Sequence, residues 1–164
     1  MSKIQAGQMA PTFALSGVDG REHALGDALK KGPVLAAFFK ISCPVCQFTF
    51  PFIERMYESY GGEKVSFWGI SQDNAGDTKD FLAEYGVKFQ ALVDSDGYKV
   101  SKLYGLTNVP TLFLIQPDGK VETACVGFVK SEIERMAAQM ATASGKPLQA
   151  IFRPGEQIPE YRPG

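Results

Sequence analysis

The feature that most constrains the fold of this chain is residues 34–52, where an apolar run leads directly into a C-x-x-C motif. The continuous apolar run predicts a buried strand. Pro44 predicts the start of a helix, since the first helical turn tolerates the missing N–H of proline. Cys43 and Cys46 then share one face of the helix, within reach of a disulfide bridge. The unpaired amides and the dipole at the start of the helix favour a thiolate on Cys43.

This arrangement predicts thiol–disulfide exchange. Cys43 is the expected nucleophile, which attacks a partner disulfide and forms a mixed disulfide. Cys46 is the expected resolving thiol, which attacks Cys43 and releases the reduced partner. A zinc site would need about four ligands, and only the distant Cys125 and His23 are left to complete one. A copper site that combines a C-x-x-C pair with a histidine late in the chain is also not supported, because no histidine follows His23. We therefore expect no metal and no cofactor.

Further motifs resemble those of the thioredoxin-like superfamily. C-P-V-C at 43–46 is similar to a thioredoxin-type active site, and Pro51 stands where such proteins kink the following helix. V-P-T at 109–111 resembles the cis-proline loop that faces the cysteine pair in that fold. A-P-T-F-A-L at 10–15 is similar to the entry of the AhpC/TSA (redoxin) and TlpA-like branch. The resemblance implies a thiol–disulfide oxidoreductase and covers the chain from about residue 7 to about residue 143.

The resemblance also implies the architecture. It predicts an α/β fold, a thioredoxin-like three-layer α/β/α sandwich with an N-terminal β-hairpin and an inserted helix–strand unit near 72–95. It further implies a cis peptide bond before Pro110. Such a bond would place backbone groups of Val109 beside Cys43, where they could pair with an extended substrate strand.

Local signals place the elements in an order that fits this fold. Asp19-Gly20 predicts the turn of a hairpin within 11–25, Asn74 predicts a helix cap, and S-E-I-E at 131–134 predicts a capping box. After a short helix or turn at 26–31, the expected order is strand 34–40, helix 44–59, strand 65–71, helix 75–85, strand 89–93, helix 98–104, strand 111–115, strand 120–128 and helix 131–143. Strand 65–71 should run parallel to 34–40, because a helix joins them.

The end of the chain differs in composition from the rest. Residues 144–164 hold four of the ten prolines and several glycines, with no clear periodicity. We therefore divide the chain into a redoxin domain at 1–143 and an extended tail at 144–164. The tail has apolar side chains that suit packing either on its own domain or on a neighbour: Leu148, Ile151, Phe152, Ile158 and Tyr161.

Composition narrows the partners and the compartment. A net charge of −1 gives no overall attraction to nucleic acid or to an anionic membrane. No apolar run is long enough to span a bilayer, and residues 1–7 lack the apolar core of a signal peptide. Three cysteines suit catalysis better than a disulfide scaffold. We expect a cytoplasmic protein whose partners are protein thiols and disulfides and an upstream dithiol reductant.

The surroundings of the motif depart from the family pattern. Thioredoxins carry a buried Asp six residues before the first cysteine, and Ala37 stands there. Several TlpA-like proteins carry Glu three residues after the second cysteine, where this chain has Thr49. Asp73 is the candidate substitute, because strands 34–40 and 65–71 should end on the same side of the sheet. A role as a loop or cap residue is the competing interpretation of Asp73.

Lys40 interrupts the apolar strand three residues before Cys43. Its ammonium would favour the thiolate form of Cys43 if it lay nearby. The alternative is a lysine at the end of a strand whose charged head extends into water. Both interpretations stay open from the sequence.

The remaining cysteine and the histidine receive plainer interpretations. Cys125 lies on a predicted strand on which Val121, Thr123 and Cys125 share one face, so we expect a small buried hydrophobic residue there. His23 is expected to be an exposed polar residue in the hairpin.

Two rival functions come from the same residues. A peroxiredoxin-like peroxidase would carry P-x-x-x-(T/S)-x-x-C, but Ala36 and Lys40 stand at the matching positions. A thioredoxin-fold binding module that has lost its redox turnover would explain the missing carboxylates. The C-x-x-C fits dithiol exchange better than either rival.

Overall fold

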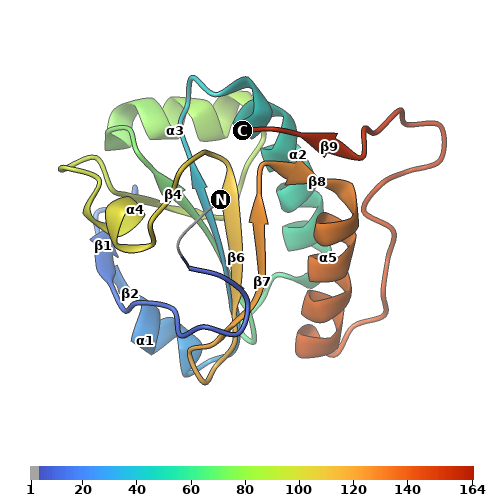
Figure 1. Ribbon diagram of the computed structural model, residues 1–164, viewed down its shortest axis with the longest axis horizontal. Coiled ribbons are helices and arrows are strands. Elements are labelled where there is room, and N and C mark those ends of the chain that lie inside the picture. Colours follow the sequence, from blue (N-terminus) through green and yellow to red (C-terminus); the bar gives the residue numbers. More distant parts are fainter. Residues whose placement is uncertain (1–3) are drawn as a thin grey trace.

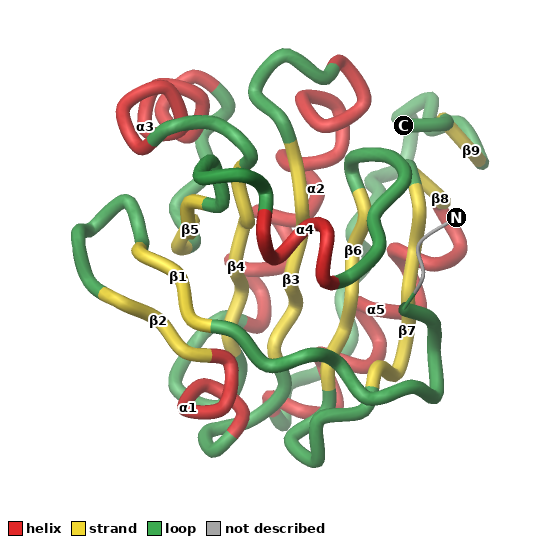
Figure 2. Tube along the Cα trace, turned by 60° about the vertical axis from the view of Figure 1, so that its left-hand side comes forward, coloured by secondary structure: helices red, strands yellow, loops and turns green. Residues whose placement is uncertain are grey.

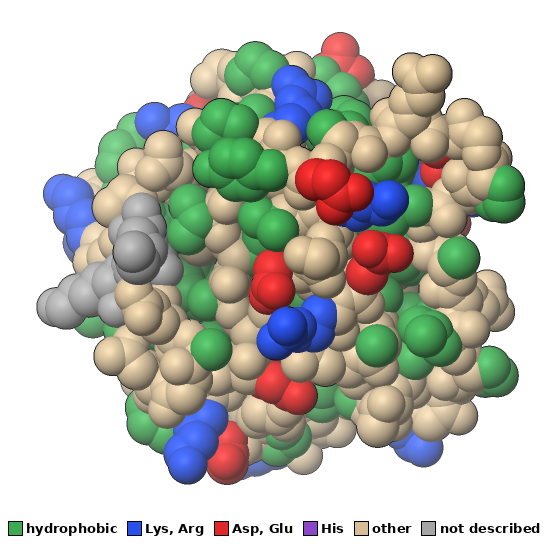
Figure 3. Space-filling view, turned by 45° about the vertical axis from the view of Figure 1, so that its right-hand side comes forward, with side chains coloured by type: hydrophobic (Ala, Val, Ile, Leu, Met, Phe, Trp, Pro, Cys, Tyr) green, Lys and Arg blue, Asp and Glu red, His purple; other side chains and the backbone are tan. Residues whose placement is uncertain are grey.

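The computed structural model describes residues 4–164. Residues 1–3 lie outside the described part, and they belong to the segment 1–7 in which the sequence shows no signal peptide. No helix within residues 4–164 combines the length and the apolar character needed to cross a bilayer. In the view that brings the tail and the last helix forward, acidic and basic side chains lie next to each other without forming one charged patch (Figure 3).

A five-stranded sheet in the order β5-β4-β3-β6-β7 forms the middle of the molecule (Figure 2). Its strands are β3 (Val34–Phe39), β4 (Ser66–Ser71), β5 (Gln90–Val93), β6 (Thr111–Ile115) and β7 (Val121–Val126). The first three run parallel to one another, as expected for strands joined by helices, and β6 and β7 are antiparallel. The central strand β3 therefore has a parallel neighbour on one side and an antiparallel neighbour on the other.

Helices cover both faces of the sheet, which confirms the three-layer α/β/α sandwich (Figure 1). On one face lie α2 (Pro44–Tyr60), α5 (Lys130–Ser144) and α3 (Ala75–Glu84), the last through Phe81. The other face carries α1 (Leu25–Leu29), α4 (Lys99–Leu103) and the hairpin of β1 (Ala14–Ser16) and β2 (Glu22–Ala24). The helix–strand unit α3–β5 occupies the position expected for the insertion near 72–95.

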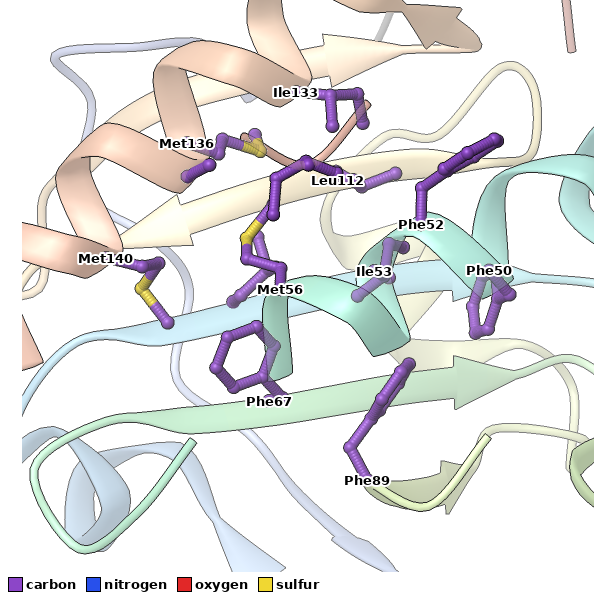
Figure 4. Close-up of a cluster of buried hydrophobic side chains, with 14 of the residues drawn as sticks. Phe50, Phe52, Ile53, Met56, Phe67, Phe89, Leu112, Ile133, Met136 and Met140 are labelled. Carbon is purple, nitrogen blue, oxygen red and sulfur yellow. The ribbon is translucent and has the colours of Figure 1, made fainter. Parts of the chain in front are cut away.

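The sheet is buried on both faces because β3 is apolar throughout. Leu35, Ala37 and Phe39 face the cluster under α2 and α5, while alternate residues face the cluster under α1 and α4. Figure 4 shows the first cluster, in which Met56 of α2 points toward Leu112 of β6 and the methionines of α5. Since β3 is enclosed on both faces, the point at which it ends and the chain turns into α2 is tightly fixed.

A bulge in the edge strand corrects the predicted face of Val121. The β6–β7 register shifts between Leu114 and Ile115, so one strand has an extra residue there. Thr123 and Cys125 face α5, whereas Val121 packs in the opposite cluster. A bulge moves the following side chains to the other face, because successive residues of a strand alternate.

The predicted capping box of the last helix is also wrong. The cap position of α5 is Val129, which makes no side-chain cap, and Ser131 lies inside the helix. The Lys130 N–H is instead satisfied by the Glu160 carbonyl oxygen at 2.9 Å. The start of α5 therefore takes its backbone partner from the tail, which local sequence rules do not consider.

The tail packs on its own domain, which resolves the choice between its own domain and a neighbour. Its strand β9 (Tyr161–Arg162) pairs antiparallel with β8 (Phe128–Val129), a short strand that follows β7 (Figure 1). Phe152 packs against Phe52 of α2, with ring centroids 5.1 Å apart. The tail thus covers the side of α2 that the sheet leaves open.

Glu54 is a buried carboxyl group on α2, with 5% of its surface exposed. Its Oε1 accepts the Lys88 N–H at 2.8 Å, and Oε2 has no partner among the described residues. Desolvation raises the pKa of Glu54, and the hydrogen bond from Lys88 only partly opposes this. Because the folded-state pKa is raised, its contribution to stability is fully present at low pH and is lost as pH rises through that pKa.

Replacement of Glu54 by Gln should remove this pH-dependent loss, because the amide keeps an acceptor for Lys88 and carries no charge. We expect Glu54→Gln to raise the melting temperature relative to wild type at pH 7, and to raise it less at pH 4. Thermal unfolding at both pH values measures the difference. Glu63→Gln, at an exposed carboxylate after α2, is the control. Equal shifts at the two pH values would contradict the assignment.

Candidate active site

The two cysteines lie at the start of α2, which follows the end of β3 after a short loop. Cys43 is the N-cap of the helix and Pro44 is its first residue, as the sequence predicts. The Cys46 N–H donates a hydrogen bond to Cys43 Sγ at 3.1 Å, and both cysteines are free thiols. Cys43 thus caps the helix with its sulfur, at the positive end of the helix dipole.

The loop before β6 faces this cysteine pair. The Val109–Pro110 peptide bond is cis, as expected from the resemblance. The Cys43 thiol donates to the Val109 carbonyl oxygen at 3.5 Å, and Thr111 Oγ1 donates to the Asn108 carbonyl oxygen at 2.7 Å. The fold therefore brings Cys43 and Val109 together although 66 positions separate them in the sequence.

Burial makes the two thiols unequal. Cys43 is partly exposed, whereas Cys46 has no exposed surface. Burial, followed by the hydrogen bond with Cys43, raises the pKa of Cys46 well above its ordinary value, and the negative charge of Asp73 adds to this. The accessible thiol at the helix end suits attack on an external disulfide. The buried thiol needs to lose its proton before it can react.

Two side chains hold the loop between β3 and α2. Asp73 Oδ2 accepts the Ile41 N–H at 2.9 Å, and Gln47 Nε2 donates to the Ile41 carbonyl oxygen at 2.9 Å. Asp73 therefore lies at the site, as expected from the ends of the parallel strands. Gln47 was missed by the sequence analysis, and its only signal is an amide directly after the second cysteine. Both groups fix the backbone two residues before Cys43.

Lys40 contributes its backbone directly. Its carbonyl oxygen accepts the Cys43 N–H at 3.3 Å, while the side chain is exposed. The influence of its ammonium on Cys43 stays a prediction.

The two positions that depart from the family pattern are filled by groups without a carboxylate. Ala37 is buried in β3, and Thr49 is fully buried in α2, where its Oγ1 donates to the Val45 carbonyl oxygen at 2.6 Å. Neither side chain can take a proton from Cys46 as a carboxylate would. Asp73 is the carboxylate whose charge acts on Cys46.

The third cysteine is buried in β7, as expected. Cys125 has 2% of its surface exposed, and its thiol donates to the Gly127 carbonyl oxygen at 3.4 Å. Burial raises the pKa of Cys125 to about 12, so it is a poor nucleophile at neutral pH. Within residues 4–164, no three His, Cys, Asp or Glu side chains are grouped to hold a metal ion.

The hairpin histidine is less exposed than predicted. His23 is partly buried, because its ring packs edge-on against Trp68 and its Nε2 bonds to Asp19 at 3.1 Å. Its partners belong to the hairpin and to β4, so the structure gives it no contact with the cysteine pair.

Known proteins match this chain over most of its length. The AhpC/TSA family matches residues 6–124. The chain is 32% identical over 126 residues to the thiol-disulfide oxidoreductase ResA of Bacillus thuringiensis (strain Al Hakam), which covers 76% of this chain and 72% of that protein. The tail beyond residue 144 lies outside the family match.

Solved structures share the fold. A structure named as a thiol:disulfide interchange protein DsbE, from Chlorobium tepidum, has a TM-score of 0.75 and 31% sequence identity, covering 87% of this chain and 100% of that one. A solution structure named as a protein disulfide isomerase, from Bacteroides thetaiotaomicron, has a TM-score of 0.81 with 23% identity, covering 88% of this chain and 93% of that one. The second likeness is one of fold alone.

Replacement of Lys40 by Met keeps the aliphatic stem and removes the ammonium. If that charge favours the Cys43 thiolate, Lys40→Met will slow alkylation of Cys43 at pH 7 and move its pH profile to higher pH. Iodoacetamide labelling of the reduced protein, mapped by mass spectrometry, measures this. Lys64→Met, at an exposed lysine after α2, is the control. An unchanged profile would leave Lys40 as a strand-end residue only.

Proposed function

This chain belongs to the AhpC/TSA family and is a thiol–disulfide oxidoreductase, and we propose that Cys43 is its nucleophile and Cys46 its resolving thiol. The observation that carries this assignment is the inequality of the two thiols. Cys43 is accessible and caps α2, whereas Cys46 is fully buried behind it with a raised pKa.

The reaction begins when the Cys43 thiolate attacks one sulfur of a partner disulfide. The partner S–S bond breaks, a bond forms between Cys43 and the attacked sulfur, and the other partner sulfur leaves as a thiolate that takes up a proton. Cys46 then loses its proton and attacks Cys43 Sγ. The Cys43–Cys46 bridge forms and the second partner thiolate leaves, so two electrons have passed from the enzyme dithiol to the partner.

The substrates are protein thiols and disulfides, and the return of the enzyme to its dithiol form requires an upstream dithiol. We propose that an extended segment of the substrate pairs with the backbone at Val109, beside Cys43. The contact between Cys43 and the Val109 carbonyl oxygen supports this, since added strands bind through main-chain hydrogen bonds.

We also propose that the protein works as a reductase in the cytoplasm. Three cysteines suit a redox enzyme better than a disulfide-stabilised secreted domain. Where glutathione keeps ordinary thiols reduced, a dithiol of this kind passes electrons outward to oxidised proteins.

A redox titration against glutathione tests the roles and the direction together. The dithiol assignment predicts a reversible Cys43–Cys46 bridge by mass spectrometry, with a potential near that of thioredoxin, about −270 mV. Cys46→Ser should trap Cys43 as a mixed disulfide with glutathione, and Cys43→Ser should leave Cys46 unmodified.

Other outcomes of this titration favour a different function. A potential near −120 mV would make the protein an oxidant. Oxidation of Cys43 to a sulfenic acid, or pairing of Cys43 with Cys125, would favour the peroxidase alternative.

We further propose that Asp73 accepts the proton of Cys46 in the resolving step. Its hydrogen bond to the Ile41 N–H holds it at the site, and its charge acts on Cys46. The usual carboxylates are replaced by Ala37 and Thr49, which leaves this work to another group.

Replacement of Asp73 by Asn separates two effects of opposite sign. Asn keeps an acceptor for the Ile41 N–H but carries no negative charge. By electrostatics alone, removal of that charge lowers the pKa of Cys46 and speeds resolution. Loss of a proton acceptor instead slows resolution, and we expect the slower rate, with mixed disulfide accumulating. Stopped-flow reaction with a glutathionylated peptide measures it. Asp80→Asn, at an exposed position of α3, is the control, and a faster resolving step would contradict the role.

A further inference from the structure

The last residues of the tail reach the loop that faces Cys43. Gly164 packs so closely on the Val109 carbonyl oxygen that a side chain at 164 would have no room. Asn108 Nδ2 donates to the Gly164 oxygen at 3.4 Å. The carbonyl group that accepts the Cys43 thiol is therefore also in contact with the tail. Figure 1 shows this end of the chain beside the start of α2.

Gly127, between β7 and β8, joins the tail to the same loop. Its N–H donates to the Pro110 carbonyl oxygen at 2.8 Å. A Cβ at residue 127 would lie 2.6 Å from the Arg162 carbonyl oxygen, and the φ of +77° also favours glycine there. The backbone of the tail thus packs on a backbone position that is hydrogen-bonded to the cis-proline loop.

The earlier part of the tail is firmly anchored. Arg55 of α2 donates to both carboxylate oxygens of Glu156, at 2.8 and 2.7 Å, and to the Ile151 carbonyl oxygen at 3.0 Å. The hydrogen bonds from Arg55 lower the pKa of Glu156 to about 2, so the pair stays charged at neutral pH. Tyr60 Oη accepts the Gln149 N–H at 2.7 Å. These contacts hold residues 149–156 against α2.

The segment Tyr161–Gly164 is held by weaker contacts. The strand β9 has two residues, and the guanidinium of Arg162 lies 4.7 Å from the centre of the Phe48 ring. The hydrogen bond from Asn108 is long. Release of this segment therefore needs few contacts to break, while the anchor at 149–156 keeps it near the site.

We propose that Tyr161–Gly164 is a specificity element that covers the Val109 carbonyl group and restricts which disulfides reach Cys43. An extended polypeptide that pairs with Val109 has to displace this segment first. A small disulfide needs only the partly exposed thiol of Cys43. The inference rests on the proposed pairing of protein substrates at Val109. The segment would make the enzyme selective for small disulfides, which avoid it, and for extended polypeptides that compete with it for Val109.

Two variants test the inference through the ratio of two rates. A chain ending at Glu160 lacks the segment but keeps a main-chain oxygen of residue 160, now in the terminal carboxylate, to accept the Lys130 N–H. Arg162→Ala weakens the segment at full length. Dithiol-driven reduction of insulin is compared with that of cystamine, a small disulfide. We expect the insulin-to-cystamine ratio to rise roughly two- to fivefold in Arg162→Ala, the effect of one partly exposed cation–π contact, and further in the shortened chain.

Leu148→Ala is the control, because Leu148 belongs to the tail, is 64% exposed and lies outside the segment. It should leave the ratio unchanged. Insulin turnover that begins only in the shortened chain also supports the inference. If the shortened chain fails to fold, Arg162→Ala carries the test alone.

If the variants reduce cystamine but their insulin-to-cystamine ratio equals that of wild type, the specificity role is overturned and the proposed function stays intact. A lower ratio would also overturn it, since it would make the segment a docking element for protein substrates. Failure of wild type and every variant to reduce either disulfide would contradict the proposed function, and the inference with it.

Discussion

Burial of the central strand on both faces is the constraint on which the rest of the structure depends. Every residue of β3 is enclosed, with Leu35, Ala37 and Phe39 facing α2 and α5 and the alternate residues facing α1 and α4. Apolar burial of this extent leaves the strand no freedom to shift its register, because a slip by one residue would exchange its two faces. The loop at 40–43 therefore starts from a fixed point. Asp73 and Gln47 then hold that loop through the Ile41 backbone, and Cys43 is delivered to the start of α2.

The chemistry of the site follows from an uneven environment around two identical side chains. Cys43 is at the end of a helix with access to solvent, and Cys46 is one turn further in, beneath the surface. Desolvation raises the pKa of the inner thiol and so favours its protonated form in the reduced enzyme. Ala37 and Thr49 stand in place of the usual carboxylates, and we propose that Asp73, just after the end of β4, takes over the acid–base part of the reaction. On that proposal, the same fold supports dithiol exchange with a different placement of its carboxylate.

The tail contacts three parts of the redoxin domain: the start of α5, the open side of α2 and the cis-proline loop. It supplies the backbone partner for the start of α5, covers the open side of α2 through Phe152, and ends against the cis-proline loop. Its tight anchor and its weakly held end lie within a few residues of each other. This arrangement fits the proposal that Tyr161–Gly164 exchanges places with a substrate while the anchor at 149–156 stays attached.

The sequence by itself determined the order of the elements and the cysteine pair at a helix start, because these depend on local periodicity, on proline and on motif spacing. Its resemblance to the thioredoxin-like superfamily implied the layered α/β fold and the position of Pro110 opposite the pair. It also indicated Asp73, since the ends of adjacent parallel strands are predictable. The tertiary structure alone decided the face of Val121, the cap of α5, the role of Gln47 and the path of the tail. The face of Val121 depends on a bulge, and the role of Gln47 on a side-chain bond to the Ile41 carbonyl oxygen. The cap of α5 and the path of the tail depend on backbone contacts between distant segments, such as Lys130 with Glu160 or Val109 with Gly164. Main-chain groups are the same in every residue, so the sequence carries no direct signal of which ones meet.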